Sequence, residues 1–280
     1  MSKYHQGDAT YPVALSLKIK NVKESKFFYN EILGFSIFEE HENHIYYTIN
    51  GHDIILKTIV DSNASLRRPS QGLYHVAYLF NTQEALAQVI QNIAKHKYPI
   101  TGAADHGVSD ALYLDDPDGN GIELYYDTDP TYWSDIDQNP SKIENKPFNY
   151  NFYLQLKVKP LIKIDSKTIL GHMHLHSANL AKASSFYQTV LDYQMIINVG
   201  SAHFLSSVEY HHHLALNTWA GTLKPKADAV GLIDVTYQVG SDERFIKIIE
   251  QLNALNVPYE LDGNSLHTVD PDGVKLILKK

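Results

Sequence analysis

An internal repeat constrains the fold of this 280-residue chain more than any other feature of its sequence. The segment LSLKIKNVKESKFFYNEILGF, at residues 15–35, matches the segment MHLHSANLAKASSFYQTVLDY, at residues 173–193. The match aligns Asn21 with Asn179 and the Phe-Tyr pair at 28–29 with the pair at 186–187. Each copy alternates like a strand, then has an Asn suited to cap a helix, then apolar residues at three- and four-residue spacing. The repeat therefore predicts two copies of a strand followed by a helix.

A second repeated pair lies downstream of each copy. The segments that begin at Gly72 and Gly231 again read as a strand followed by an amphipathic helix. Both are followed by Asp-Pro-Asp-Gly, at 116–119 and 270–273, and then by a strand. This tetrapeptide favours a turn, because proline fixes its own φ and glycine adopts positive φ. We predict an α+β fold of four units, each a strand, a helix and short strands.

The repeats also set the expected domain boundaries. Residues 8–127 are predicted to hold the first pair of units and residues 168–280 the second pair. Residues 128–167 between them are polar and contain four prolines, so we interpret them as a linker or an irregular extension.

Composition narrows the function. The absence of cysteine excludes disulfides, thiolate nucleophiles and cysteine-bound metals, so a metal site has to use His, Asp or Glu. The fifteen histidines are clustered. A formal net charge of −8 without a basic block argues against nucleic-acid or membrane partners and favours a small molecule. The polar N-terminal residues and the lack of an apolar run of about 18 residues lead us to expect a cytoplasmic protein. A homo-oligomer is a separate possibility.

The repeated βαβββ pattern, the Phe-Tyr pair and the DPDGNGIELYY strand at 116–126 resemble the vicinal-oxygen-chelate superfamily. This superfamily includes glyoxalases, antibiotic-resistance thiol transferases and binders, and extradiol dioxygenases. The resemblance covers nearly the whole chain outside 128–167. It implies that units pair into curved sheets around a cavity, with a divalent metal on inward-facing residues of the first and last strands of a unit.

The residues at these ligand positions differ between the units. The second unit has His75 and Glu123, and the third has His172, which the repeat aligns with Ala14. The first and fourth units offer Ala14, Ile55, Asp234 and Ile277.

Two orders of pairing are possible. Pairing in chain order leaves each cavity with an incomplete ligand set. Pairing of unit 72–127 with unit 168–219 gathers His75, Glu123 and His172, the two-histidine, one-carboxylate set of non-haem Fe(II) enzymes. We favour this permuted pairing.

Further motifs resemble extradiol dioxygenases. Tyr113, Pro117, Gly119 and Glu123 match the spacing Tyr-x-x-x-Pro-x-Gly-x-x-x-Glu, and His106 precedes Tyr113 by seven residues. The resemblance implies that Tyr113 hydrogen-bonds a bound substrate oxygen and that His106 orients or protonates the same side.

The stretch His211-His212-His213-Leu214-Ala215 matches the His-His-x-x-Ala motif that these enzymes carry on a strand. The match assigns the acid–base role to His212, although strand alternation would transfer this role to His211 or His213 if His212 faced away. His174 and His176 share the face of His172 and are further pocket candidates.

These observations predict an extradiol dioxygenase that uses Fe(II), or Mn(II), to open a catechol-type diol with O₂. One alternative is a glyoxalase-like isomerase or thiol transferase with Zn, Ni or Mn, which normally has four protein ligands rather than three. Another is a metal-free binding protein, which the presence of all three candidate ligands disfavours.

Overall fold

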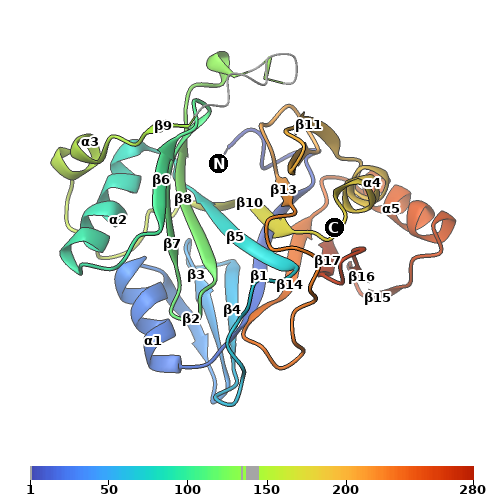
Figure 1. Ribbon diagram of the computed structural model, residues 1–280, viewed down its shortest axis with the longest axis horizontal. Coiled ribbons are helices and arrows are strands. Elements are labelled where there is room, and N and C mark those ends of the chain that lie inside the picture. The colour runs from blue at the N-terminus through green and yellow to red at the C-terminus, as the bar shows by residue number, and fades with distance from the viewer. Residues whose placement is uncertain (1, 134, 137–144) are drawn as a thin grey trace.

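The computed structural model describes residues 2–133, 135–136 and 145–280. Two mixed β-sheets lie next to each other, and helices cover the two outer flanks (Figure 1). The helical segments are α1 (Val22–Lys26), η1 (Phe27–Ile32), α2 (Gln83–Lys95), η2 (Pro130–Tyr132), α3 (Tyr150–Gln155), α4 (Leu180–Val190) and α5 (Asp242–Ala254).

Four βαβββ units follow one another along the chain, which confirms the predicted α+β fold. Their strands are, in the first unit, β1 (Tyr11–Ile19), β2 (Ser36–Glu40), β3 (His44–Thr48) and β4 (Ile54–Val60); in the second, β5 (Gly72–Leu79), β6 (Gly102–Asp105), β7 (Ser109–Asp115) and β8 (Gly121–Asp127); in the third, β10 (Ile169–His176), β11 (Gln194–Asn198), β12 (Ala202–Ser206) and β13 (Leu214–Asn217); and in the fourth, β14 (Gly231–Gln238), β15 (Tyr259–Asp262), β16 (Ser265–Val269) and β17 (Lys275–Lys279).

The two predicted helix caps are confirmed. The side chain of Asn21 accepts hydrogen bonds from the backbone N–H groups of Lys23 and Glu24. The side chain of Asn179 accepts one from the backbone of Lys182. These bonds satisfy N–H groups that have no partner within the first turn of a helix. Equivalent residues of the repeat therefore start equivalent helices.

Units that are not consecutive in the chain pair to form each sheet. The eight-stranded sheet has the order β15-β16-β17-β14-β1-β4-β3-β2, so it joins the fourth unit to the first. The nine-stranded sheet has the order β11-β12-β13-β10-β5-β8-β7-β6-β9 and joins the third unit to the second. In both, the first strands of two units meet antiparallel, β1 with β14 and β5 with β10. This is the permuted order.

Consecutive units are nevertheless held together across the two sheets. The buried Tyr29 hydroxyl donates to Oδ2 of Asp116 at 2.8 Å, and the buried Tyr187 hydroxyl donates to Oδ2 of Asp270 at 3.0 Å. Each aspartate is the first residue of an Asp-Pro-Asp-Gly turn. In the first of these turns Gly119 has a φ of +78°, which glycine adopts readily. The tyrosines of the repeat thus fasten each turn to the helix of the preceding unit, besides packing in the core.

The described parts of the segment 128–167 include the short strand β9 and the helices η2 and α3. Strand β9 (Lys146–Pro147) pairs with β6 and extends the nine-stranded sheet, and α3 packs against α2. The Gln91 side chain donates to the backbone oxygens of Tyr153 and Leu156, which fixes α3 in place. Residues 134 and 137–144 of this segment, Pro140 among them, lie outside the described residues.

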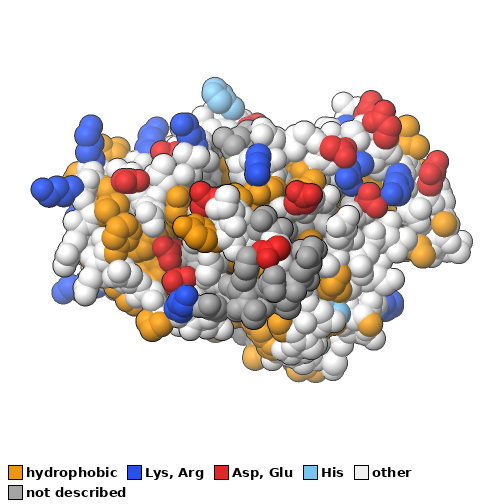
Figure 2. Space-filling view, turned by 90° about the horizontal axis from the view of Figure 1, so that it is seen from above, with side chains coloured by type: hydrophobic (Ala, Val, Ile, Leu, Met, Phe, Trp, Pro, Cys, Tyr) orange, Lys and Arg blue, Asp and Glu red, His pale blue; other side chains and the backbone are white. Residues whose placement is uncertain are grey.

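Charges of both signs are distributed over the surface. Acidic and basic side chains are intermingled on the face seen in Figure 2. Among the described residues, no helix has the length and apolar character needed to cross a membrane.

Candidate metal centre

Three adjacent strands at the middle of the nine-stranded sheet bring the candidate ligands together. His75 lies on β5, Glu123 on β8 and His172 on β10. Ala77 of β5 pairs with His172 on one side and with Glu123 on the other. The small methyl group of Ala77 lets the longer side chains of its two neighbours meet above it. His75 precedes Ala77 by two residues and so points to the same face.

The donor atoms of these three residues converge. Nε2 of His75 lies 2.9 Å from Oε2 of Glu123, and Nε2 of His172 lies 3.1 Å from the same oxygen. The three ligand atoms all lie within 4.8 Å of one another. All three side chains are buried, with residue exposures of 6%, 3% and 2% for His75, Glu123 and His172.

The electrostatics of the cluster favour the protonation states of metal ligands. Burial favours the neutral acid, but the adjacent imidazoles of His172 and His75 outweigh it and hold the pKa of Glu123 well below its ordinary value. Burial lowers the pKa of His172 even though Glu123 opposes the shift. A carboxylate and a neutral imidazole are the forms that bind a divalent cation.

The arrangement fits a bound metal ion. Ligand atoms held at right angles about 2.1 Å from one ion lie about 3 Å apart, which agrees with the two separations to Oε2 of Glu123. Within the described part of the chain, Nε2 of His75 is buried without a hydrogen-bond partner, although it lies 2.9 Å from Oε2 of Glu123. A buried polar atom without a partner is costly, and a cation held by all three residues would satisfy it.

Tyr113 and His106 lie together beside this cluster. Nε2 of His106 is 2.8 Å from the Tyr113 hydroxyl, and the Tyr113 ring is 5.6 Å from the His75 ring. Burial, followed by the charge of Glu123, raises the pKa of Tyr113 well above its ordinary value. Tyr113 therefore stays a phenol and keeps its proton to donate. A cavity of about 400 Å³ adjoins Tyr113 and His75 and extends to Asp115.

Comparison with known proteins identifies the family. The model of the "Glyoxalase/Bleomycin resistance protein/Dioxygenase superfamily" matches residues 13–124. A protein of Bacillus subtilis (strain 168) named "Catechol-2,3-dioxygenase" is 31% identical over 264 residues, which cover 91% of this chain and 92% of that protein. The chain belongs to this superfamily.

Two solved structures share the fold of this chain. A putative dioxygenase from Bacillus subtilis subsp. subtilis str. 168 aligns with a TM-score of 0.68 at 13% identity, over 98% of this chain and 86% of that chain. Glyoxalase I from Zea mays aligns with a TM-score of 0.59 at 14% identity, over 97% of this chain and 92% of that chain. At such identities, the likeness shows a common fold.

The three consecutive histidines differ from the expected strand. Residues 211–213 form a bend before β13, so the alternation of a strand does not apply to them. His212 packs on His172 with ring centroids 4.1 Å apart, while Nε2 of His213 points to the Tyr4 carbonyl at 2.9 Å. Burial and then the nearby imidazoles lower the pKa of His212 well below its ordinary value. Of the three, His212 lies closest to the cluster.

The other pocket candidates on β10 have partners of their own. The Asn217 side chain donates to Nε2 of His174 at 2.8 Å, and its Oδ1 lies 2.6 Å from Nδ1 of His176. His174 contacts the His75 ring at 4.8 Å. These two histidines therefore line the surroundings of the cluster without contributing a converging ligand atom.

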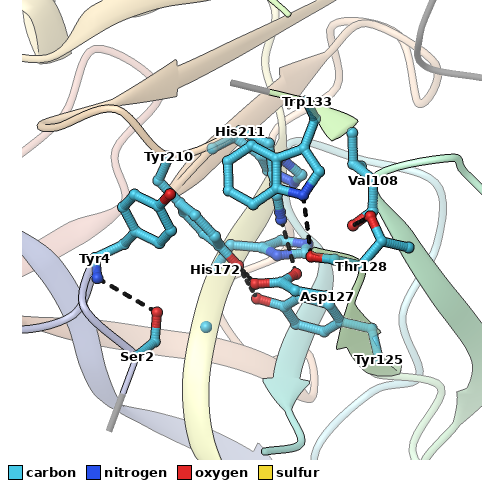
Figure 3. A network of polar contacts seen from close by, with 12 residues as sticks. Ser2, Tyr4, Val108, Tyr125, Asp127, Thr128, Trp133, His172, Tyr210 and His211 are labelled. Carbon is cyan, nitrogen blue, oxygen red and sulfur yellow. Dashed lines mark hydrogen bonds and ion pairs between the residues drawn. The ribbon is translucent and has the colours of Figure 1, made fainter. Parts of the chain in front are cut away.

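The sequence reasoning missed a polar network on the other side of His172 (Figure 3). Asp127 accepts from Nε2 of His211 at 2.9 Å and from the Tyr210 hydroxyl at 3.0 Å. The Tyr210 hydroxyl also lies 2.8 Å from the hydroxyl of Tyr125, whose ring is 5.0 Å from the His172 ring. Alternation along β8 was the available signal, because it places 123, 125 and 127 on one face.

Proposed function

We propose that this protein is an Fe(II)-dependent extradiol dioxygenase that opens a catechol-type aromatic diol with O₂; Mn(II) is the alternative metal. The observation that carries the proposal is the convergence of His75, Glu123 and His172, with His212 and Tyr113 beside them. Two imidazoles and one carboxylate leave open coordination positions, which this reaction needs for substrate and O₂. The similarity to the Bacillus subtilis protein named "Catechol-2,3-dioxygenase" also supports it.

His75, Glu123 and His172 would hold the metal, which, when bound, supplies a common centre that orients and polarises the diol and O₂. The protein's remaining task is to fix the substrate and move protons. The reaction breaks the ring bond beside the diol and places both oxygen atoms of O₂ in the product. It therefore requires no side chain as a nucleophile, which agrees with a site built from histidine, tyrosine and carboxylate.

Proton transfer is assigned to two sides of the site. His212 accepts a proton from the diol hydroxyl and returns it later in the reaction, since its lowered pKa keeps the imidazole neutral beforehand. On the other side the neutral Tyr113 donates a hydrogen bond to a substrate oxygen. His106, 2.8 Å from the Tyr113 hydroxyl, orients that hydroxyl.

Metal analysis followed by an activity assay tests the proposal. Protein purified without oxygen is expected to hold or accept iron, and the iron-loaded form is expected to convert members of a catechol panel into yellow ring-opened products with uptake of one O₂ per diol. The metal-free protein serves as the blank. Tightly held zinc or nickel without catechol turnover would favour an isomerase, and failure to bind any metal would favour a binding protein.

A further inference from the structure

Asp127 joins the polar network directly to the candidate base. Its carboxylate lies at the end of β8, four residues beyond Glu123, with a side-chain exposure of 15%. Each oxygen accepts one hydrogen bond, Oδ1 from Nε2 of His211 and Oδ2 from the Tyr210 hydroxyl (Figure 3). A carboxylate accepts hydrogen bonds and donates none. Asp127 therefore requires that Nε2 of His211 carries a proton.

This requirement passes to His212. In its neutral form His211 carries one N–H, and a proton on Nε2 then leaves Nδ1 as an acceptor. Nδ1 of His211 lies 2.8 Å from Nδ1 of His212, and a hydrogen bond between two nitrogens needs one proton. That proton comes from Nδ1 of His212. Nε2 of His212 then holds a lone pair.

We propose that Asp127 is a positioning residue that fixes the tautomers of His211 and His212, so that Nε2 is the nitrogen of His212 that accepts the substrate proton. The inference rests on the proposed function, because it concerns how the base of that reaction is prepared. It adds a carboxylate and a second histidine behind a base that already lies against His172.

The surroundings hold this chain of hydrogen bonds in place. His211 has a residue exposure of 1%, and the Trp133 ring covers it at a centroid distance of 5.3 Å. Since Tyr210 gives its proton to Asp127, the Tyr125 hydroxyl is the donor in the bond between the two tyrosines. A Cβ at position 171 would collide with the Tyr125 hydroxyl, so Gly171 is required for this packing beside His172.

The tautomers can be measured without metal or substrate. In metal-free protein with ¹⁵N-labelled histidine at pH 8, the nitrogen shifts distinguish the protonated from the unprotonated nitrogen of each imidazole. We expect His211 to be protonated at Nε2 and His212 at Nδ1, with signals assigned from His211→Gln and His212→Gln. In Asp127→Asn, Nε2 of His211 no longer has to carry a proton, because the amide can donate a hydrogen bond to it. The protons of the His211 and His212 rings should then redistribute between their nitrogens.

Tyr210→Phe is the matched control. It removes the second hydrogen bond to Asp127, keeps the ring that packs on His211, and leaves the bond from Nε2 of His211 intact. The tautomers of His211 and His212 should then stay as in the unmodified protein. The proposal is overturned if Asp127→Asn leaves both tautomers unchanged, or if Tyr210→Phe alters them as much.

Kinetics give a second readout. Replacing the carboxylate behind the catalytic histidine of a serine protease by an amide lowers kcat about 10⁴-fold with the geometry intact. With one more imidazole between carboxylate and base, we expect Asp127→Asn to lower kcat by about 10- to 100-fold while KM and metal content stay the same. Equal loss in kcat and metal content would indicate a structural role and overturn the proposal. If the tautomers follow Asp127 but no catechol is cleaved, the control of the two tautomers by Asp127 stands, whereas the dioxygenase proposal and the role of His212 as its base fail.

Discussion

The two sheets pair their central strands in the same register. They differ in the side chains at the three positions that correspond to His75, Glu123 and His172. In the nine-stranded sheet His172 pairs with Ala77, and Ala77 pairs with Glu123. In the eight-stranded sheet Ala14 pairs with Thr236, and Thr236 pairs with Ile277.

The position of His75 follows the same logic. His75 pairs with His174 in one sheet, and Asp234 pairs with Ser16 in the other. One backbone arrangement therefore occurs twice, and only the nine-stranded sheet collects a converging set of ligand atoms within the described chain. The fold supplies the positions, and side-chain identity alone decides where a metal could bind.

Replacing one candidate ligand should cause the largest change in the difference in metal binding between the two sheets. We expect His172→Ala to reduce the affinity for Fe(II) or Mn(II) by more than about 100-fold, since changes to groups that merely support a ligand cost about 10- to 100-fold. His75→Ala should be as severe. Asp234→Ala, at the matched position of the other sheet, should leave the affinity unchanged in anaerobic calorimetry. A loss of metal in Asp234→Ala instead would move the centre to the eight-stranded sheet.

Introducing the three ligands into the eight-stranded sheet should have a smaller effect on metal affinity. In a His172→Ala background, Ala14→His, Asp234→His and Ile277→Glu give the eight-stranded sheet the same three ligands. We expect this variant to bind one divalent ion, more weakly than the original site because the supporting hydrogen bonds are not transplanted. Calorimetry and metal content measure the gain. No binding would mean that the shared register is insufficient.

Thr236 offers a refinement of the transplant. It stands where the nine-stranded sheet has Ala77, and its side chain occupies the space over which the two outer ligands have to meet. Adding Thr236→Ala should therefore tighten binding in the transplanted site by about tenfold, a change of the size seen for groups that support ligands. An equal affinity with and without this change would remove the role assigned to Ala77.

The repeat made much of this comparison predictable from the sequence. The capping residues Asn21 and Asn179, the aligned pair Ala14 and His172 and the four units follow from local pattern. The order of pairing was harder, because both orders satisfy the same local pattern and only the inventory of ligands favoured one. The spacing of residues along the chain does not indicate which unit's first strand pairs with which.

The network around Asp127 shows a second limit. The contact between Asp127 and His211 joins residues 84 positions apart, and it depends on the bend at residues 207–213. Strand alternation was applied to the three histidines, but they lie outside a strand, so the pattern could not say which ring faces His172. The family motif selected His212 independently of that pattern, and the ring distance to His172 agrees with it.

The smallest expected difference between the two halves concerns stability, and it is measured by removing the equivalent hydroxyls of Tyr29 and Tyr187. Asp116 Oδ2 accepts from Tyr29 and from the Asn120 side chain, whereas the described contacts of Asp270 Oδ2 include only Tyr187. Hydrogen bonds to charged groups contribute about 1.5–3 kcal/mol. In urea unfolding at pH 8 we expect Tyr187→Phe to lower the free energy of unfolding by about 3 kcal/mol and Tyr29→Phe by about 1.5 kcal/mol.

The cost of Tyr187→Phe should depend on pH. Burial raises the pKa of Asp270 to about 6 in the folded protein, above the ordinary value of about 3.9. The folded state thus binds the proton more tightly, and the contribution of Asp270 to stability falls as pH rises from about 4 to about 6. At pH 5 the folded carboxyl is largely neutral, so losing the Tyr187 hydroxyl costs less there than at pH 8. An equal loss at both pH values would show that Asp270 stays ionised at pH 5.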